Sequence, residues 1–151
     1  MKEIIVLSPL SGEVVQLKKV KDEVFSAEVL GEGIAIIPDR GTVVSPVSGT
    51  VNSVADAKHA INVIGDSGEE LLIHIGLDTV TLKGSAFTPR VKAGDKVKQG
   101  DVLMEFDLQG IRGAGLDTVS PVVVLNTADY RKVEGVSGRV KQGAPLLTIR
   151  A

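Results

Sequence analysis

The chain contains no cysteine, which excludes disulfides, thiolate nucleophiles and cysteine-bound metals. Aromatic residues make up only 3% of it, with no tryptophan, so its few phenylalanines cannot form a stacking platform for nucleic-acid bases. The formal net charge of -2 also lacks the basic excess of a nucleic-acid binder. No apolar run approaches the roughly 20 residues of a membrane-spanning helix, and the apolar stretch "IIVL" near the N-terminus is too short for a signal peptide.

What remains is an aliphatic sequence interrupted by turns. The chain has 151 residues, of which 43% are hydrophobic, and we expect one domain spanning 1–151. Short β-branched runs such as "EIIVL", "AINVIG" and "PVVVLN" alternate with glycine-rich turns, and this pattern predicts an all-β sandwich or barrel of many short strands. Two short helical segments are also expected, over 108–115 after Asp107 and over 127–133 after Asn126.

Two pieces of sequence each occur twice. "SPLSGEVVQL" from Ser8 matches "SPVSGTVNSV" from Ser45, and "KVKQGDVLMEF" from Lys96 resembles "RVKQGAPLLTI" from Arg139. Such repetition predicts two similar halves related by a pseudo-two-fold axis. The glycine of each "SPxSG" is expected to supply the positive φ of a tight turn.

One of the only two histidines lies in the apolar segment "ELLIHIG". In a strand, residues two apart share a face, so Leu71, Ile73 and Ile75 should face the core and His74 should face away from it, beside Gly76. A histidine bonded to a backbone carbonyl inside the core is the alternative interpretation.

The second histidine, His59, opens the run "HAINVIG", where alternation groups it with Ile61 and Val63. The "GDSGEE" turn falls roughly midway between the two histidines, so a hairpin would place them on neighbouring strands at similar height, where they could face each other. Two adjacent imidazoles fit phosphoryl carriage, metal binding with a nearby carboxylate, or acid-base catalysis on a small molecule. The spacing does not choose among these chemistries.

Several segments together resemble the IIA domains of the sugar phosphotransferase system, in the glucose, sucrose and β-glucoside class. The resemblance rests on "SPLSGEVVQL", "DEVFSAEVLGEGIAIIP", "VVSPVSGTV", "KHAINV", "LLIHIGLDTVTLKG", "VKAGDKVKQGDVLMEFDL" and "SPVVVLNT", in this order and at suitable spacing. It covers nearly the whole chain. It implies an antiparallel β-sandwich with no organic cofactor, located in the cytoplasm or at the membrane through a permease.

The resemblance also implies unequal roles for the histidines. His74 would accept a phosphoryl group from the phosphohistidine of the carrier protein HPr and pass it to a cysteine on a IIB domain, which makes the chain a phosphotransferase component of sugar uptake. His59 would support the phosphoryl group, and the carbonyl of Gly76 would hold one nitrogen of His74. Some members of the family also regulate other proteins.

A docking surface around the histidines is implied as well. An apolar ring with acidic points suits brief docking on a basic-rimmed partner. Phe25 is the member that strand and turn signals place near a loop. The matching positions are Asp22, Val24, Phe25, Val29, Leu30, Leu72, Asp78 and Val80.

One departure and two alternatives qualify this interpretation. Many members have threonine two residues before the first histidine, whereas this chain has Ala57 and so lacks a hydroxyl there. A biotinyl- or lipoyl-type swinging-arm carrier, with Lys58 as the modified residue, would also show two β halves with "VKAGDKVKQGD"-like turns. A zinc-binding regulatory β-domain is the second alternative, with His59, His74 and a carboxylate as ligands. The resemblance also allows transient zinc binding at His59 and His74 when a partner supplies a further ligand.

Overall fold

The computed structural model describes residues 3–151, and its strands pair only in antiparallel fashion. The main sheet has eight strands in the order β13-β2-β3-β11-β7-β6-β5-β9. Their bounds, in that spatial order, are Arg139–Val140, Gly12–Gln16, Glu32–Pro38, Ser120–Val124, Glu70–His74, Ala60–Gly65, Gly49–Val54 and Lys96–Val97.

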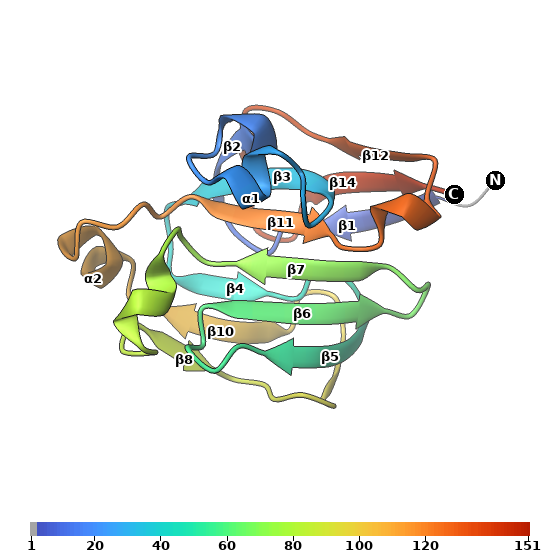
Figure 1. Ribbon diagram of the computed structural model, residues 1–151. Coiled ribbons are helices and arrows are strands. Elements are labelled where there is room, and N and C mark those ends of the chain that lie inside the picture. The colour runs from blue at the N-terminus through green and yellow to red at the C-terminus, as the bar shows by residue number, and fades with distance from the viewer. Residues whose placement is uncertain (1–2) are drawn as a thin grey trace.

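Two three-stranded sheets complete the architecture, one in the half of the molecule with β2 and β3 and one in the half with β5 and β6 (Figure 1). The first is β1-β14-β12, with bounds Glu3–Leu7, Pro145–Arg150 and Lys132–Gly135. The second is β4-β10-β8, with bounds Thr42–Val44, Val102–Phe106 and Phe87–Pro89. The predicted all-β class is confirmed.

Helices are few and short. The segment expected over 108–115 forms α2 (Leu108–Gly113), with a carboxylate oxygen of Asp107 accepting from the Gly110 N–H at 2.9 Å. The helix expected over 127–133 is wrong beyond one 3-10 turn, η3 (Thr127–Asp129), because Lys132 and Val133 already pair with β14. The other helical turns are η1 (Leu17–Lys19), α1 (Glu23–Ser26) and η2 (Thr79–Leu82). No helix within 3–151 is long and apolar enough to cross a membrane.

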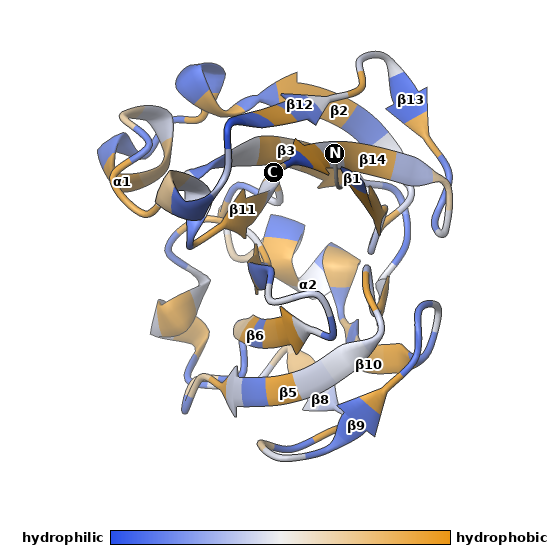
Figure 2. Cartoon of the chain, turned by 90° about the vertical axis from the view of Figure 1, so that its right-hand side faces the viewer, coloured by the Kyte–Doolittle hydropathy of each residue, from blue (hydrophilic) through white to orange (hydrophobic). Residues whose placement is uncertain are grey.

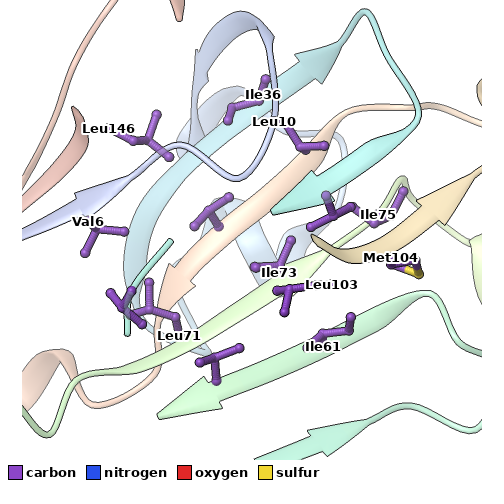
Figure 3. Close-up of a cluster of buried hydrophobic side chains, with 14 of the residues drawn as sticks. Val6, Leu10, Ile36, Ile61, Leu71, Ile73, Ile75, Leu103, Met104 and Leu146 are labelled. Atoms are coloured by element: carbon purple, nitrogen blue, oxygen red, sulfur yellow. The ribbon is translucent and has the colours of Figure 1, made fainter. Parts of the chain in front are cut away.

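The core fills the space between the sheets. Strands such as β2 and β5 carry both hydrophobic and hydrophilic residues (Figure 2). Aliphatic side chains from both halves meet inside, among them Val6, Ile36, Ile73 and Leu103 (Figure 3), all fully buried. A smaller apolar cluster lies beneath α1 and contains Leu17, Val20, Phe25, Ala35, Leu77, Val119 and Val123.

The two repeated sequences form two similar halves, as predicted. The order of the main sheet reads alike from both ends, with a hairpin (β2-β3 or β5-β6) beside one central strand (β11 or β7). The central strands pair at Val122 and Ile73. The "SP" turns exchange equivalent bonds: the Leu7 N–H donates to the Pro46 carbonyl, and the Val44 N–H to the Pro9 carbonyl, both at 3.0 Å.

The glycine that closes each "SPxSG" is needed for close backbone approach. A Cβ on Gly12 would lie 1.9 Å from the carbonyl oxygen of Ile37, and one on Gly49 would lie 2.0 Å from that of Ile64. The expected positive φ is present at Gly12, with φ 158°, but is wrong for Gly49, whose φ is not positive. The close approach of β2 to β3 and of β5 to β6 therefore excludes a side chain at both glycines.

Candidate functional site

The β6-β7 hairpin brings the two histidines together. Ala60 is the Cα partner of His74, and the Ile75 N–H donates to the His59 carbonyl at 2.8 Å. The two imidazole rings lie with their centroids 4.8 Å apart and their planes at 86°. The hairpin predicted from the turn between them is therefore confirmed.

Strand alternation is right for His74 and wrong for His59. Leu71, Ile73 and Ile75 are fully buried, which leaves His74 on the opposite face. Alternation alone would send His59 into the core with Ile61. However, β6 begins only at Ala60, and the preceding residues form a turn in which Lys58 has φ 65° and its N–H donates to the Ala55 carbonyl at 2.8 Å. Because His59 belongs to this turn, its ring reaches the side of His74.

The tautomer of His74 is set by a backbone carbonyl. The Nδ1 atom of His74 lies 2.8 Å from the carbonyl oxygen of Gly76. A carbonyl oxygen can only accept, so Nδ1 carries the hydrogen and Nε2 of the neutral ring keeps its lone pair. The contact with Gly76 expected from the resemblance is present.

The Gly76 carbonyl is itself held in place by its surroundings. Gly76 has φ 73°, and its N–H donates to the Ser120 hydroxyl at 3.2 Å. The Thr79 hydroxyl donates to the Ile75 carbonyl at 2.5 Å, and the Leu77 N–H donates to the Asp117 carbonyl at 2.9 Å. These supports were not predicted from the sequence. Ser120 lies 44 residues from Gly76, and no local pattern connects them.

Phe25 forms a wall of the site rather than part of its exposed rim. It lies in α1, whose N-cap Asp22 accepts from the Val24 N–H at 2.9 Å, and this turn directs the phenyl ring inward. Only 5% of Phe25 is exposed, and its ring meets the His74 ring edge-on at 5.0 Å. Phe25 was expected near a loop, in an exposed docking ring. It is buried instead, because it lies in a short helix.

The other matching positions lie at the surface or partly beneath it. Val24, Val29 and Val80 are 45%, 70% and 52% exposed. Leu30 and Asp78 are exposed as well, whereas Asp22 and Leu72 are half-buried. Asp22 precedes α1 and Asp78 follows β7, yet both act electrostatically on His74. Acidic groups from two segments thus converge on the histidine.

Burial keeps both imidazoles neutral. It is the largest cause of a lowered pKa at His74, to about 4, and nearby His59 lowers it further. The hydrogen bond to Gly76 and the carboxylates of Asp22 and Asp78 act in the opposite direction. Burial also lowers the pKa of His59. At neutral pH the site therefore presents an uncharged nucleophilic nitrogen beside a second uncharged ring.

The lowered pKa of His74 predicts a pH-dependent stability. The pKa of His74 is near 6.5 in the unfolded chain and about 4 in the folded one, so between these values the unfolded state binds a proton that the folded state does not. The free energy of unfolding is therefore unaffected by this group above pH 6.5 and falls as the pH drops toward 4. Between pH 7 and pH 4.5 the wild-type protein should lose about 2 to 3 kcal/mol more unfolding free energy than a His74→Gln variant. Urea unfolding at both pH values measures this difference, and equal losses in the two proteins would contradict it.

Metal binding at this site would need ligands from elsewhere. Within 3–151 no group of three or more His, Asp or Glu side chains is arranged to hold a metal ion. The facing imidazoles could supply two of the four ligands that zinc usually takes. A partner protein would have to supply the others.

Comparisons with known proteins agree with one another. Residues 4–130 match the family model described as phosphoenolpyruvate-dependent sugar phosphotransferase system, EIIA 1. A glucose permease IIA from Mycoplasma capricolum has the same fold, with a TM-score of 0.90 and 35% identity over 98% of this chain and 96% of that one.

Three relatives are similar in sequence. Beta-glucoside-specific EIIBCA components of Bacillus subtilis and Dickeya chrysanthemi are 55% and 51% identical over 83% and 92% of the chain. The chain spans only 21% and 22% of those two proteins. A glucose-specific EIIA component of Oceanobacillus iheyensis is 46% identical over 89% of the chain and 82% of its own length. This chain belongs to the EIIA 1 family of the phosphoenolpyruvate-dependent sugar phosphotransferase system.

Proposed function

We propose that Nε2 of His74 accepts a phosphoryl group from the phosphohistidine of HPr and passes it to a cysteine of a IIB domain. The observation that supports this most directly is the bond from Nδ1 of His74 to the Gly76 carbonyl, which leaves Nε2 as the free nucleophile beside His59. In the first step a P–N bond to the donor histidine breaks as the P–Nε2 bond forms. In the second step the P–Nε2 bond breaks as a P–S bond forms on the cysteine.

Catalysis here depends on position and charge more than on covalent help. A transferring phosphoryl group carries its charge on peripheral oxygens, which need donors held ready. His59 is the imidazole at hand, and a donor nitrogen on its ring can meet a phosphoryl oxygen carried by His74. Phe25 and the apolar cluster beneath α1 limit the access of water to the phosphoryl group, which strengthens the hydrogen bonds to its oxygens.

The relatives support the identity of the second partner. Two of them are named as EIIBCA components, and such a name places IIA together with IIB and IIC in one chain. We infer that a IIB domain, fused or separate, receives the phosphoryl group in the cytoplasm. The sugar is selected by a IIC domain, and this chain corresponds to only about a fifth of each EIIBCA relative.

The proposal is tested by phosphorylation with phosphoenolpyruvate, enzyme I and HPr. The wild-type chain should acquire one acid-labile, base-stable phosphate, and His74→Ala should acquire none. Peptide mapping should place the phosphate on His74. Stable labelling of a folded His74→Ala protein would defeat the assignment, and failure of the folded wild type to accept phosphate from HPr would defeat the function.

The exposed aliphatic residues near His74 are the proposed docking surface for HPr. Placing a lysine at Val80, beside Asp78, removes apolar contact and repels a basic-rimmed partner. We expect Val80→Lys to slow phosphoryl transfer from HPr about tenfold, by an amount that shrinks as salt is added. Val102→Lys is the matched control, because Val102 is 43% exposed on β10 of another sheet. Equal rates for the two variants would contradict this surface.

A further inference from the structure

A third polar side chain on this hairpin has no role in the proposed chemistry. The Oδ1 atom of Asn62 is buried without a hydrogen-bond partner. Among the side chains of residues 3–151, one other buried nitrogen or oxygen has no hydrogen-bond partner, and it is Nδ1 of His59. Buried polar atoms are nearly always paired, so each of these two requires an explanation. The two are complementary, because a ring nitrogen can donate and an amide oxygen can only accept.

The register of β6 places Asn62 on the face of the sheet that carries the site. Ala60 pairs with His74 and Asn62 pairs with Leu72, so Asn62 shares a face with His74. His59 lies three residues before Asn62, a span of about 10 Å in an extended strand, and the turn at Lys58 carries its ring toward this face. The ring of His59 is already on this face, against that of His74. The ladder between β5 and β6 is also irregular at this point, between Val51 and Ser53.

The residues between the turn and His59 offer this nitrogen no acceptor. Ala57 has no polar side-chain atom, and Lys58 can only donate. The carboxylate of Asp56 in the same turn is exposed, whereas Nδ1 of His59 is buried without a partner. The ring of His59 faces that of His74, whose Nδ1 is already bonded to Gly76, and the carboxylates of Asp22 and Asp78 act on His74. Burial is the only cause resolved for the pKa shift of His59, so no carboxylate offsets it.

We propose that Asn62 is a positioning residue for His59, its amide oxygen accepting from the Nδ1–H of the imidazolium that His59 becomes when His74 carries a phosphoryl group. This rests on the proposed function. The phosphoryl dianion favours a charged His59, which takes up one proton from solvent. The ring then donates from Nε2 to a phosphoryl oxygen and from Nδ1 to Asn62. Without Asn62, the second donor would remain buried and unpaired, which disfavours the imidazolium.

The test is the titration of His59 in the intact chain, followed by NMR of its ring nitrogens. Asn62→Leu removes the acceptor at similar volume, and Asn62→Asp replaces it with a charged acceptor of the same shape. Asn52→Leu is the matched control, because Asn52 is exposed on β5. In the phosphorylated protein we expect Asn62→Leu to lower the pKa of His59 by about one unit and Asn62→Asp to raise it, with the control unchanged. Transfer to IIB should fall in Asn62→Leu and recover in part in Asn62→Asp.

The outcomes separate this inference from the proposed function. Unphosphorylated protein titrated toward acid also forms the imidazolium, so the same order of pKa values is expected there, whether or not HPr phosphorylates His74. If the pKa and ring-nitrogen shifts of His59 are the same in wild type, Asn62→Leu and Asn62→Asp, the inference is overturned while the phosphoryl carrier can still stand. If Asn62→Leu does not fold, the isosteric Asn62→Asp decides alone, and an unshifted His59 pKa in it overturns the inference.

Discussion

A His59→Ala protein is expected to accept phosphate from HPr on His74 but to pass it to IIB about 10²- to 10³-fold more slowly than the wild type. The nucleophile is untouched, because Nδ1 of His74 keeps its bond to the Gly76 carbonyl and Nε2 keeps its lone pair. What is lost is the imidazole at 4.8 Å, which we propose holds the phosphoryl oxygens for attack by the cysteine. Single-turnover transfer from the isolated phosphoprotein to IIB measures the effect.

His59→Gln is the control for this prediction. Its amide keeps a hydrogen-bond donor near the phosphoryl group but cannot become a cation, so it should recover part of the lost rate. The extent of labelling by HPr at long times should stay close to wild type in both variants. A His59→Ala phosphoprotein that transfers to IIB at the wild-type rate would show that His59 does not support the phosphoryl group.

The sequence predicted the hairpin and the face of His74 because both depend on local, two-residue periodicity. Leu71, Ile73 and Ile75 are apolar without exception, and "GDSGEE" marks the turn. The repeated "SPxSG" segments likewise predicted the two halves. Each of these features depends on a few neighbouring residues, whose strand propensity and hydrophobic pattern predict the same structure.

The parts that were mispredicted depend on irregular backbone. The hairpin placed His59 opposite His74 correctly, but alternation grouped its side chain with Ile61, because the left-handed conformation of Lys58 could not be predicted from its residue type. Phe25 turns inward because four residues after Asp22 form a helix too short to show periodicity. The supports of Gly76 come from Ser120 and Asp117, which the fold brings in from the other central strand and the residues before it. Such long-range contacts leave no local signal.

Replacement of Gly76 by alanine is expected to damage both the fold and the chemistry. A Cβ at this position would lie 2.6 Å from Cγ2 of Thr79 and 2.9 Å from the carbonyl oxygen of Asp117, and φ of 73° disfavours any side chain. We expect Gly76→Ala to lose about 2 to 4 kcal/mol of unfolding free energy. Relief of the clash must move the carbonyl that fixes the His74 ring, and a displacement near 1 Å should slow acceptance from HPr about 100-fold.

Gly94→Ala is the control that separates the backbone strain of a left-handed alanine from displacement of the Gly76 carbonyl. Gly94 has φ 93° and nothing lies within 4 Å of a Cβ built there, so its replacement should cost only the left-handed conformation, about 1 to 2 kcal/mol, without slowing transfer. Denaturant unfolding should therefore show a loss of stability in both variants, whereas the rate of labelling should fall only in Gly76→Ala. If Gly76→Ala accepts phosphate as fast as Gly94→Ala, the position of the Gly76 carbonyl does not control the nucleophile. Because the Nδ1–carbonyl bond also selects the tautomer, ring-nitrogen NMR of His74 should show mixed tautomers in Gly76→Ala and a single one in Gly94→Ala.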